Sequence, residues 1–217
     1  MSSNFYSKDS VKHFAKIKDL APEQLQAFQE FDQAVFQEGS LSVKEKEIVA
    51  VAIAHVTECP FCIDIHTKKA KKAGATLEEL TEAVFVVSAI EAGGAVTHST
   101  HVHNANKKDS SDVLYARSNL QSLGKLGELA KDAFNGYKAF SAKAVAEGKL
   151  SSKFKEIIAV AVATATQCPY CIDVHTKNAK RLGATDEQLA EAIMVSSALR
   201  AGGAYAHMAV MIESYES

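Results

Sequence analysis

Apolar positions along the chain follow the period of a helix. β-branched residues seldom alternate with polar ones, and stretches such as 47–54 are apolar on nearly every side. Alternation with a period of two is typical of a half-buried strand, whereas an apolar run of this kind favours a buried helix. The pattern predicts an all-α protein.

Capping residues predict where several helices begin and end. Ser42 and Glu45 form a capping box for the helix that contains the apolar run. A second helix is expected to begin at Cys59, with Pro60 in its first turn, and to end near Gly74. Two further capping boxes are predicted for later helices, at 76–79 and 185–188.

The chain contains two similar copies of one sequence at an offset of 109 residues. Residues 47–75 and 156–184 are identical at 19 of 29 positions. The two copies predict a duplicated fold of about five helices each, related by a pseudo-twofold axis, with domains at 1–106 and 107–217. The polar run 104–112 has no apolar periodicity and is predicted to be the linker.

Composition narrows the function classes. The 217 residues are 47% hydrophobic and 23% charged, which is typical of a folded globular chain. A net charge of −2 provides no broad field for nucleic acid, so we expect no nucleic-acid partner. No signal-like apolar region opens the chain and no uncharged apolar run reaches about 18 residues. We therefore expect no membrane association and a cytoplasmic location.

The candidate chemistry lies in a constellation that both copies contain. Each copy has a glutamate, two cysteines separated by two residues, and a histidine four residues after the second cysteine. The two sets are Glu47, Cys59, Cys62, His66 and Glu156, Cys168, Cys171, His175. Cysteine pairs in a chain without an export signal are more often catalytic or metal-binding than structural.

The spacing assigns roles to these residues. A cysteine at a helix start is favoured as a thiolate by the exposed amides and the helix dipole. His66 shares a helix face with Cys62, so it can take the thiol proton and select Cys62 as the nucleophile. Glu47 is an acid in an apolar stretch and can orient His66. Peroxide would oxidise the nucleophile to a sulfenic acid, which Cys59 would resolve as a disulfide, and an outside dithiol would then reduce the pair.

With this spacing, E-x11-C-x2-C-x3-H, the chain resembles the AhpD-like alkylhydroperoxidase branch of the carboxymuconolactone decarboxylase-like superfamily. The resemblance implies an all-helical, duplicated AhpD-like fold that reduces organic hydroperoxides. It implies Cys62 and Cys171 as peroxidatic and Cys59 and Cys168 as resolving cysteines. It also implies a proton relay from glutamate through histidine, no bound cofactor or metal, and a thioredoxin-like or lipoyl-type dithiol donor. Single-repeat members assemble from paired units, so a homotrimer is expected, with a dimer as the second choice.

The chain departs from AhpD itself between the cysteines. AhpD carries a histidine there, whereas this chain has Phe61 and Tyr170, which we expect to line the active site. The lactone decarboxylases that name the superfamily lack the dithiol motif, so a decarboxylase-type lyase is the less favoured activity.

Other readings of these residues stay open. Two cysteines and a histidine can bind catalytic zinc, which leaves a metal-binding or non-catalytic protein as an alternative. His98 and His207 follow a double glycine in both copies and could line the active sites or be structural. His101 and His103 extend a histidine cluster in the first copy only. Asp64 and Asp173 recur, and we interpret them as surface acids near a helix start.

Overall fold

The computed structural model describes residues 8–105 and 115–216, and the all-α prediction is confirmed. The described residues form ten α-helices and two short 3-10 helices, five α-helices in each copy as expected. The first copy contains η1 (Lys8–His13), α1 (Phe14–Leu20), α2 (Pro22–Val35), α3 (Val43–Val56), α4 (Pro60–Lys72) and α5 (Leu77–Ala105). The second contains η2 (Arg117–Ser122), α6 (Leu123–Leu129), α7 (Lys131–Ala144), α8 (Ser152–Ala165), α9 (Pro169–Arg181) and α10 (Asp186–Glu216).

The predicted helix boundaries are confirmed by their hydrogen bonds. The Ser42 amide donates to the Glu45 carboxylate, and the Glu45 amide donates to the Ser42 hydroxyl, which completes the capping box of α3. Helix α4 begins with Pro60 at its first position, and Gly74 follows its end at a φ of 90°, a conformation that suits glycine. The capping boxes at 76–79 and 185–188 are also formed.

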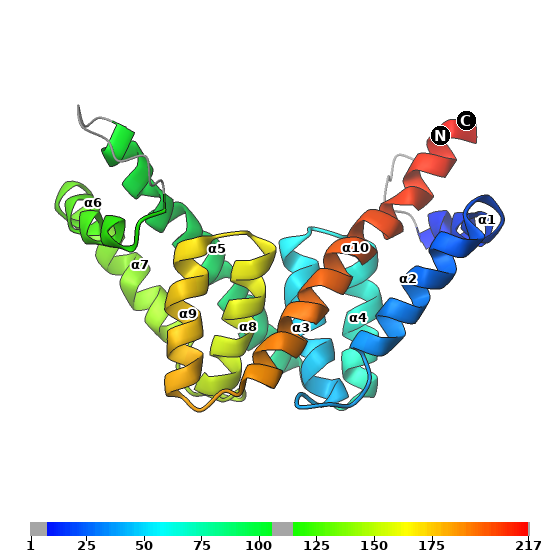
Figure 1. Ribbon diagram of the computed structural model, residues 1–217, viewed down its shortest axis with the longest axis horizontal. Helices are drawn as coiled ribbons and strands as arrows, with labels where there is room; N and C mark the ends of the chain where they lie inside the picture. Colours follow the sequence, from blue (N-terminus) through cyan, green and yellow to red (C-terminus); the bar gives the residue numbers. More distant parts are fainter. Residues whose placement is uncertain (1–7, 106–114, 217) are drawn as a thin grey trace.

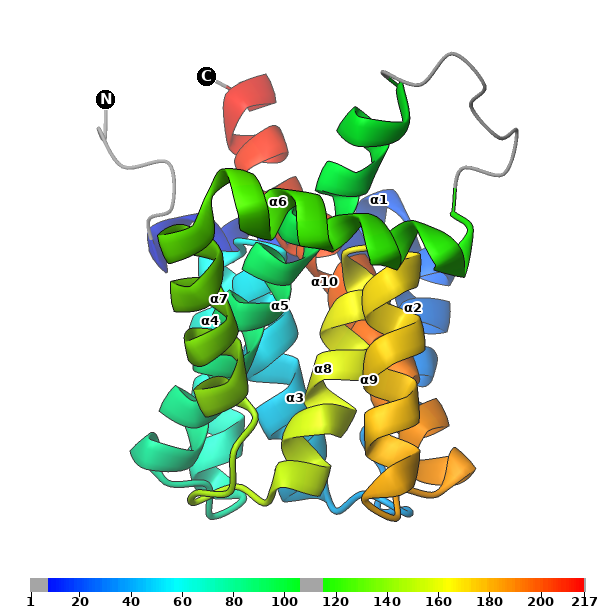
Figure 2. The same cartoon turned by 90° about the vertical axis from the view of Figure 1, so that its left-hand side faces the viewer.

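The buried apolar helices of the two copies form the centre of the molecule. Helices α3 and α8 pack against each other, and Figure 2 shows them side by side. Every residue of 48–54 and of 157–163 is buried, as the apolar run predicted. Helices α4 and α9 each pack on the central helix of their own copy, which brings both cysteine motifs next to the core.

The two longest helices cross from one copy to the other. Helix α5 belongs to the first copy but packs against α7, α8 and α9 of the second. Helix α10 packs in the same way against α2, α3 and α4 of the first. Figure 1 shows the resulting V-shaped arrangement, in which α5 lies on the side of α6–α9 and α10 lies on the side of α1–α4. Each copy therefore supplies a helix to the surroundings of the other copy's cysteines.

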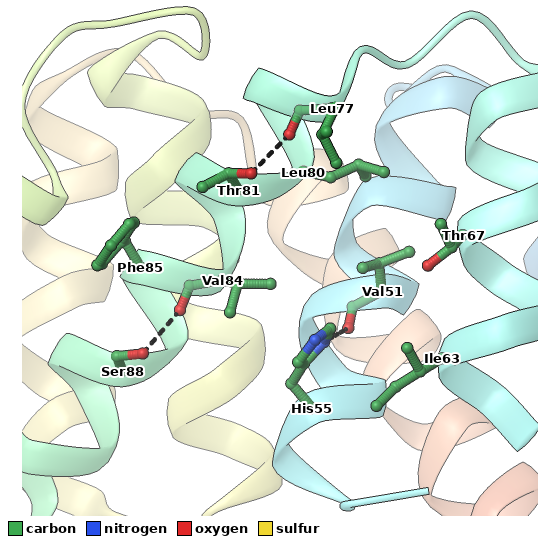
Figure 3. Close-up of a pocket in the computed structure, with 10 residues that line it drawn as sticks. All are labelled: Val51, His55, Ile63, Thr67, Leu77, Leu80, Thr81, Val84, Phe85 and Ser88. Atoms are coloured by element: carbon green, nitrogen blue, oxygen red, sulfur yellow. Dashed lines mark hydrogen bonds between the residues drawn. The ribbon is translucent and has the colours of Figure 1, made fainter. Parts of the chain in front are cut away.

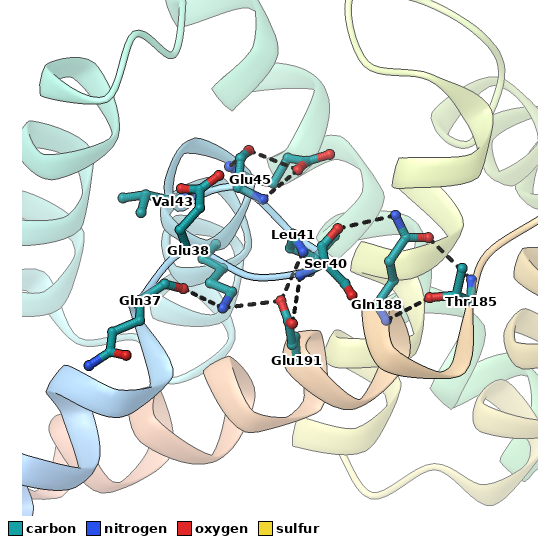
Figure 4. A network of polar contacts seen from close by, with 11 residues as sticks. Gln37, Glu38, Ser40, Leu41, Val43, Glu45, Thr185, Gln188 and Glu191 are labelled. Carbon is teal, nitrogen blue, oxygen red and sulfur yellow. Dashed lines mark hydrogen bonds and ion pairs between the residues drawn. The ribbon is translucent and has the colours of Figure 1, made fainter.

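A pair of equivalent ionic contacts fastens the exchanged helices (Figure 4). The Glu191 carboxylate of α10 accepts the amides of Ser40 and Leu41, each at 2.8 Å, and lies 3.1 Å from the Lys46 ammonium. Lys46 is only 4% exposed, so the carboxylate compensates a buried charge.

Glu82 of α5 makes the equivalent contacts to the second copy, with the amides of Lys149 and Leu150 and the buried ammonium of Lys155. Burial alone would raise the pKa of Glu82, but the two amides and Lys155 lower this pKa to about 2. The copies are thus joined by the same contact made twice.

Helix α5 is also the one described segment with the length and apolar composition of a membrane span, at Leu77–Val102. In this structure it packs against α3, α7 and α8. Of the predicted linker, Asn104 and Ala105 end this helix, and the remaining positions lie outside the described residues.

Candidate active site

A tight turn places each first cysteine at the start of a helix. Glu58 and Gln167, directly before the cysteines, have φ angles of 52° and 58°, the left-handed conformation that costs a non-glycine residue about 1 kcal/mol. Cys59 and Cys168 then cap α4 and α9, where their sulfur atoms accept the amides of the second cysteines. Both N–H···S distances are 3.3 Å, so the two copies share this contact.

The two sulfur atoms of each pair are adjacent and buried. Cys59 and Cys62 are joined as a disulfide, and the sulfurs of Cys168 and Cys171 lie 2.7 Å apart. All four cysteines are at most 5% exposed. The predicted cysteine pairing within each copy is therefore geometrically available to both.

A glutamate and histidine accompany each pair, as the spacing predicted. Nδ1 of His66 lies 2.8 Å from a Glu47 carboxylate oxygen, and the His175 to Glu156 distance is 2.7 Å. Both glutamates are 4% exposed. A carboxylate on Nδ1 fixes the ring so that Nε2 is the nitrogen left to exchange protons, as in other carboxylate–histidine pairs.

The second pair has an uneven distribution of charge. Hydrogen bonding from the Cys171 thiol and amide and from Thr97, together with the charge of His98, lowers the pKa of Cys168 to about 5, against the opposing effect of burial. The pKa of Cys171 is raised, first by its hydrogen bond to Cys168 and then by burial. These hydrogen bonds favour the charged form of Cys168, whereas the spacing with His175 selects Cys171 as the nucleophile.

A cavity of about 310 Å³ opens beside the second pair. Its lining includes Cys171 and His175 and continues onto α5 and α7 through Thr97 and Tyr137. Of the two cysteines in this pair, Cys171 is the one that lines the cavity. A small substrate in this space would meet Cys171 first.

Thr97 and Tyr137 are site residues that the sequence did not identify. The Thr97 hydroxyl lies 3.7 Å from the Cys168 sulfur and 4.0 Å from the Cys171 sulfur. Burial raises the pKa of Tyr137, so its phenol stays neutral and can donate a hydrogen bond. In the repeat alignment these residues face Ala206 and Phe28. The alignment of Tyr137 with Phe28 only extends the repeat, and Thr97 aligns with a residue of a different type, so the sequence marks neither as a site residue.

The predicted lining residues lie around the sites in a crossed arrangement. His98, from the first copy, has its ring 6.1 Å from the Tyr170 ring of the second copy and influences Cys168. His207, from the second copy, has its ring 6.5 Å from the Phe61 ring of the first. The expectation that these residues gather near the cysteines therefore holds in the geometry, but each histidine serves the other copy's pair.

The predicted histidine cluster lies among aromatic side chains. The rings of His98 and His101 are 5.6 Å apart and both contact Tyr115 and Tyr170. The side chain of His103 lies outside the described residues. Among the described residues, no three His, Cys, Asp or Glu side chains are grouped closely enough to hold a metal ion.

The first pair has different neighbours. The Phe36 ring stacks on the His66 ring at 5.4 Å, and the Lys69 ammonium lies over the Phe36 ring. The Gly203 backbone of α10 lies next to Cys59. An aromatic ring therefore covers His66 beside the first pair, whereas the hydroxyl of Thr97 lies near the sulfur atoms of the second pair.

The recurring aspartates make surface ion pairs, as interpreted from the sequence. Asp64 pairs with Lys68, and Asp173 pairs with Lys177 and Arg117.

A separate groove of about 350 Å³ lies between α3, α4 and α5. Figure 3 shows His55 beside it, with its ring nitrogen bonded to the Val51 carbonyl of its own helix at 2.8 Å. His55 aligns with Thr164 of the other copy, so it is not one of the residues that both copies share.

Comparison with known proteins identifies relatives of each half. The profile of the carboxymuconolactone decarboxylase family matches residues 22–104 and again 131–212. A Paracoccus denitrificans protein described as uncharacterised protein 4 in the cox locus is 46% identical over 86 residues, 40% of this chain and 78% of its own. An uncharacterised protein of Haemophilus influenzae is 36% identical over 95 residues, 44% of this chain and 84% of its own.

One solved structure matches nearly the whole chain. It is a crystal structure from Burkholderia xenovorans, described as a gamma-carboxymuconolactone decarboxylase subunit. It aligns with a TM-score of 0.66 and 22% identity over 94% of this chain and 90% of that one. At this identity the match supports the fold alone.

Proposed function

Since the chain belongs to the carboxymuconolactone decarboxylase family, we propose that it works as a thiol-dependent hydroperoxidase with a dithiol in each copy. The observation that carries the proposal is the repeated set of a buried glutamate, a histidine on its carboxylate and an adjacent cysteine pair. In the second copy this set opens on a cavity through Cys171 and His175.

The proposed cycle begins with proton transfer. His175, held by Glu156, takes the Cys171 proton, and the thiolate attacks the terminal oxygen of a hydroperoxide. The O–O bond breaks, Cys171 becomes a sulfenic acid, and the departing alkoxide takes a proton to become an alcohol. Cys168 then attacks the sulfenic sulfur, which releases water and leaves a disulfide.

Cys168 is suited to both later steps. Hydrogen bonds from Cys171 and Thr97 lower the pKa of Cys168, which favours the thiolate that attacks the sulfenic acid. When an outside dithiol attacks Cys171 Sγ, Cys168 departs as a thiolate, and a thiol of low pKa leaves quickly. Thioredoxin-like or lipoyl-type dithiols are the proposed donors, because two electrons must arrive as a dithiol for each turnover.

Trapping the sulfenic acid tests the assignment of the two cysteines. Cys168→Ser should accumulate a sulfenic acid on Cys171 when the metal-free, reduced protein meets stoichiometric cumene hydroperoxide, read by a dimedone label and peptide mapping. Cys171→Ser should give little label on Cys168. The reverse pattern would make Cys168 the nucleophile.

Activity of the intact chain tests the reaction class. Wild-type protein should form disulfides within both pairs and should turn over cumene hydroperoxide with a dithiol reductant. Thiols that remain reduced, together with lactone decarboxylation by the same protein, would contradict the peroxidase and support a lyase. Stoichiometric zinc that protects the thiols until a chelator is added would support a metal site.

A further inference from the structure

The two cysteine pairs share most of the groups that control a thiol. Both first cysteines cap a helix and accept one amide at 3.3 Å. Both pairs have a histidine from the crossing helix nearby, His98 or His207. These shared groups cannot make the redox chemistry of the two pairs differ.

Thr97 belongs to the second pair only. Helix α5 brings its hydroxyl to 3.7 Å from the Cys168 sulfur, and the equivalent position on α10 is Ala206, which has no hydroxyl. The other groups near Cys168 are Cys171 from α9, His98 from α5 and Tyr137 from α7.

The hydroxyl hydrogen of Thr97 has two possible acceptors. One is the Gly94 carbonyl of its own helix at 3.2 Å, and the other is the cysteine pair, where the Cys168 sulfur at 3.7 Å is nearer than the Cys171 sulfur at 4.0 Å. A thiolate is a charged acceptor and draws the hydrogen more strongly than the neutral sulfur of a disulfide does. The contact therefore stabilises the reduced, ionised pair more than the oxidised pair.

We propose that Thr97 is a positioning residue which, by donating its hydroxyl hydrogen to Cys168, makes the second dithiol pair a stronger oxidant than the first. The inference deepens the proposed function and rests on it only in treating both pairs as redox-active. A pair whose thiolate is stabilised has the higher reduction potential, and its leaving thiolate departs faster when a donor dithiol attacks Cys171 Sγ. In that step the donor–Cys171 bond forms, the Cys168–Cys171 bond breaks, and the electron pair stays on Cys168. The second donor thiol then attacks the mixed disulfide, closing the donor disulfide and releasing Cys171 as a thiolate.

The test uses full-length chains with one working pair. Cys59→Ser/Cys62→Ser retains the second pair, and Cys168→Ser/Cys171→Ser retains the first. Each is equilibrated in oxidised and reduced dithiothreitol buffers, and the fraction of disulfide is read by thiol labelling. The rate of iodoacetamide alkylation against pH gives the thiol pKa in the same proteins.

The second pair should be the more oxidising of the two, and Thr97→Val should remove most of the difference. We expect Thr97→Val to shift the exchange constant with dithiothreitol about threefold toward the disulfide and to raise the alkylation pKa by about half a unit, because one hydrogen bond to a charge is lost. Thr97→Ser keeps the hydroxyl and should retain both values. Ala206→Thr should shift the first pair in the opposite direction from Thr97→Val.

Equal potentials in the two single-pair proteins, or a Thr97→Val protein with unchanged potential and pKa, would overturn the inference. A Thr97→Ser protein that behaves like Thr97→Val would also overturn it, since shape rather than the hydroxyl would then be responsible. No hydroperoxide is used in this test. A failure of the peroxidase proposal is therefore seen separately, in the turnover assay.

Discussion

The two cysteine sites share the residues that we propose to react and differ in the residues around them. In each, a glutamate fixes a histidine beside a cysteine pair at a helix start. The hydroxyls of Thr97 and Tyr137 lie around the second pair, whereas Phe36 stacks on His66 beside the first pair. The two copies thus keep the glutamate, the histidine and the cysteine pair and differ in the groups around them, which is the basis for proposing two sites of unequal chemistry.

The largest expected effect concerns the residues that the sites share. In the chain that retains only the second pair, Glu156→Gln should lower peroxide turnover about 100-fold, because His175 loses the carboxylate that orients and recharges it. Glu47→Gln should lower turnover by a similar factor in the chain that retains only the first pair. Steady-state kcat/KM gives both numbers, and Glu128→Gln on the exposed surface of α6 is the control.

A large loss of turnover on substitution of one glutamate and none on substitution of the other would contradict the idea that the two sites share their reacting residues. In that case one copy would be catalytic and the other would have a different role.

A smaller effect is expected on stability, and it should be equal in the two copies. Glu82→Ala and Glu191→Ala should each lower the free energy of unfolding by about 2 kcal/mol, about 30-fold in the folding equilibrium, because Lys155 or Lys46 is left buried without its carboxylate. Urea unfolding measures this loss. Glu128→Ala, which removes an exposed pair, should cost less than about 0.5 kcal/mol.

The Glu82 contact also predicts how its contribution to stability changes with pH. The native pKa of Glu82 is lowered from 4.5 to about 2, so its contribution is present above pH 4.5 and is lost as the pH falls toward 2. The difference in stability between wild type and Glu82→Ala should therefore shrink in acid. A difference that grows below pH 4 would contradict the contact.

The next effect, about tenfold, distinguishes the sites directly. Removing the second pair with Cys168→Ser/Cys171→Ser should lower peroxide turnover of the whole chain about tenfold, because the Thr97 hydroxyl lies beside Cys168 and the equivalent position in the other copy is Ala206. Removing the first pair should lower turnover less than about twofold. Equal losses of turnover would show that the different residues around the two pairs have no kinetic consequence.

The smallest expected effect comes from one hydroxyl. Tyr137→Phe should lower turnover about threefold in the chain that retains only the second pair, because the neutral phenol that lines the cavity can donate to the departing alkoxide. Phe28→Tyr is the reciprocal variant in the first site. An unchanged rate for Tyr137→Phe would remove Tyr137 from the site's chemistry.

The sequence predicted what depends on local pattern. Helix ends followed from caps such as Ser42 and Gly74, and the buried central helices followed from their unbroken apolar runs. The pairing of His66 with Glu47 was anticipated because a buried acid needs a partner.

The crossing of α5 and α10 could not be predicted, because it depends on how the two copies pack and leaves no local signal. Thr97 was missed for the same reason. It is far from Cys168 in sequence, and nothing in the repeat marks it.

The most direct test of two working but unequal sites is the order in which their disulfides form. Fully reduced, metal-free protein is mixed with half an equivalent of cumene hydroperoxide per chain, quenched in acid within the first turnover, and mapped by peptide mass. We predict that the Cys168–Cys171 disulfide accumulates first and that Cys59–Cys62 follows when more peroxide is added. Equal amounts of the two disulfides at every time, or four thiols left reduced, would contradict this account.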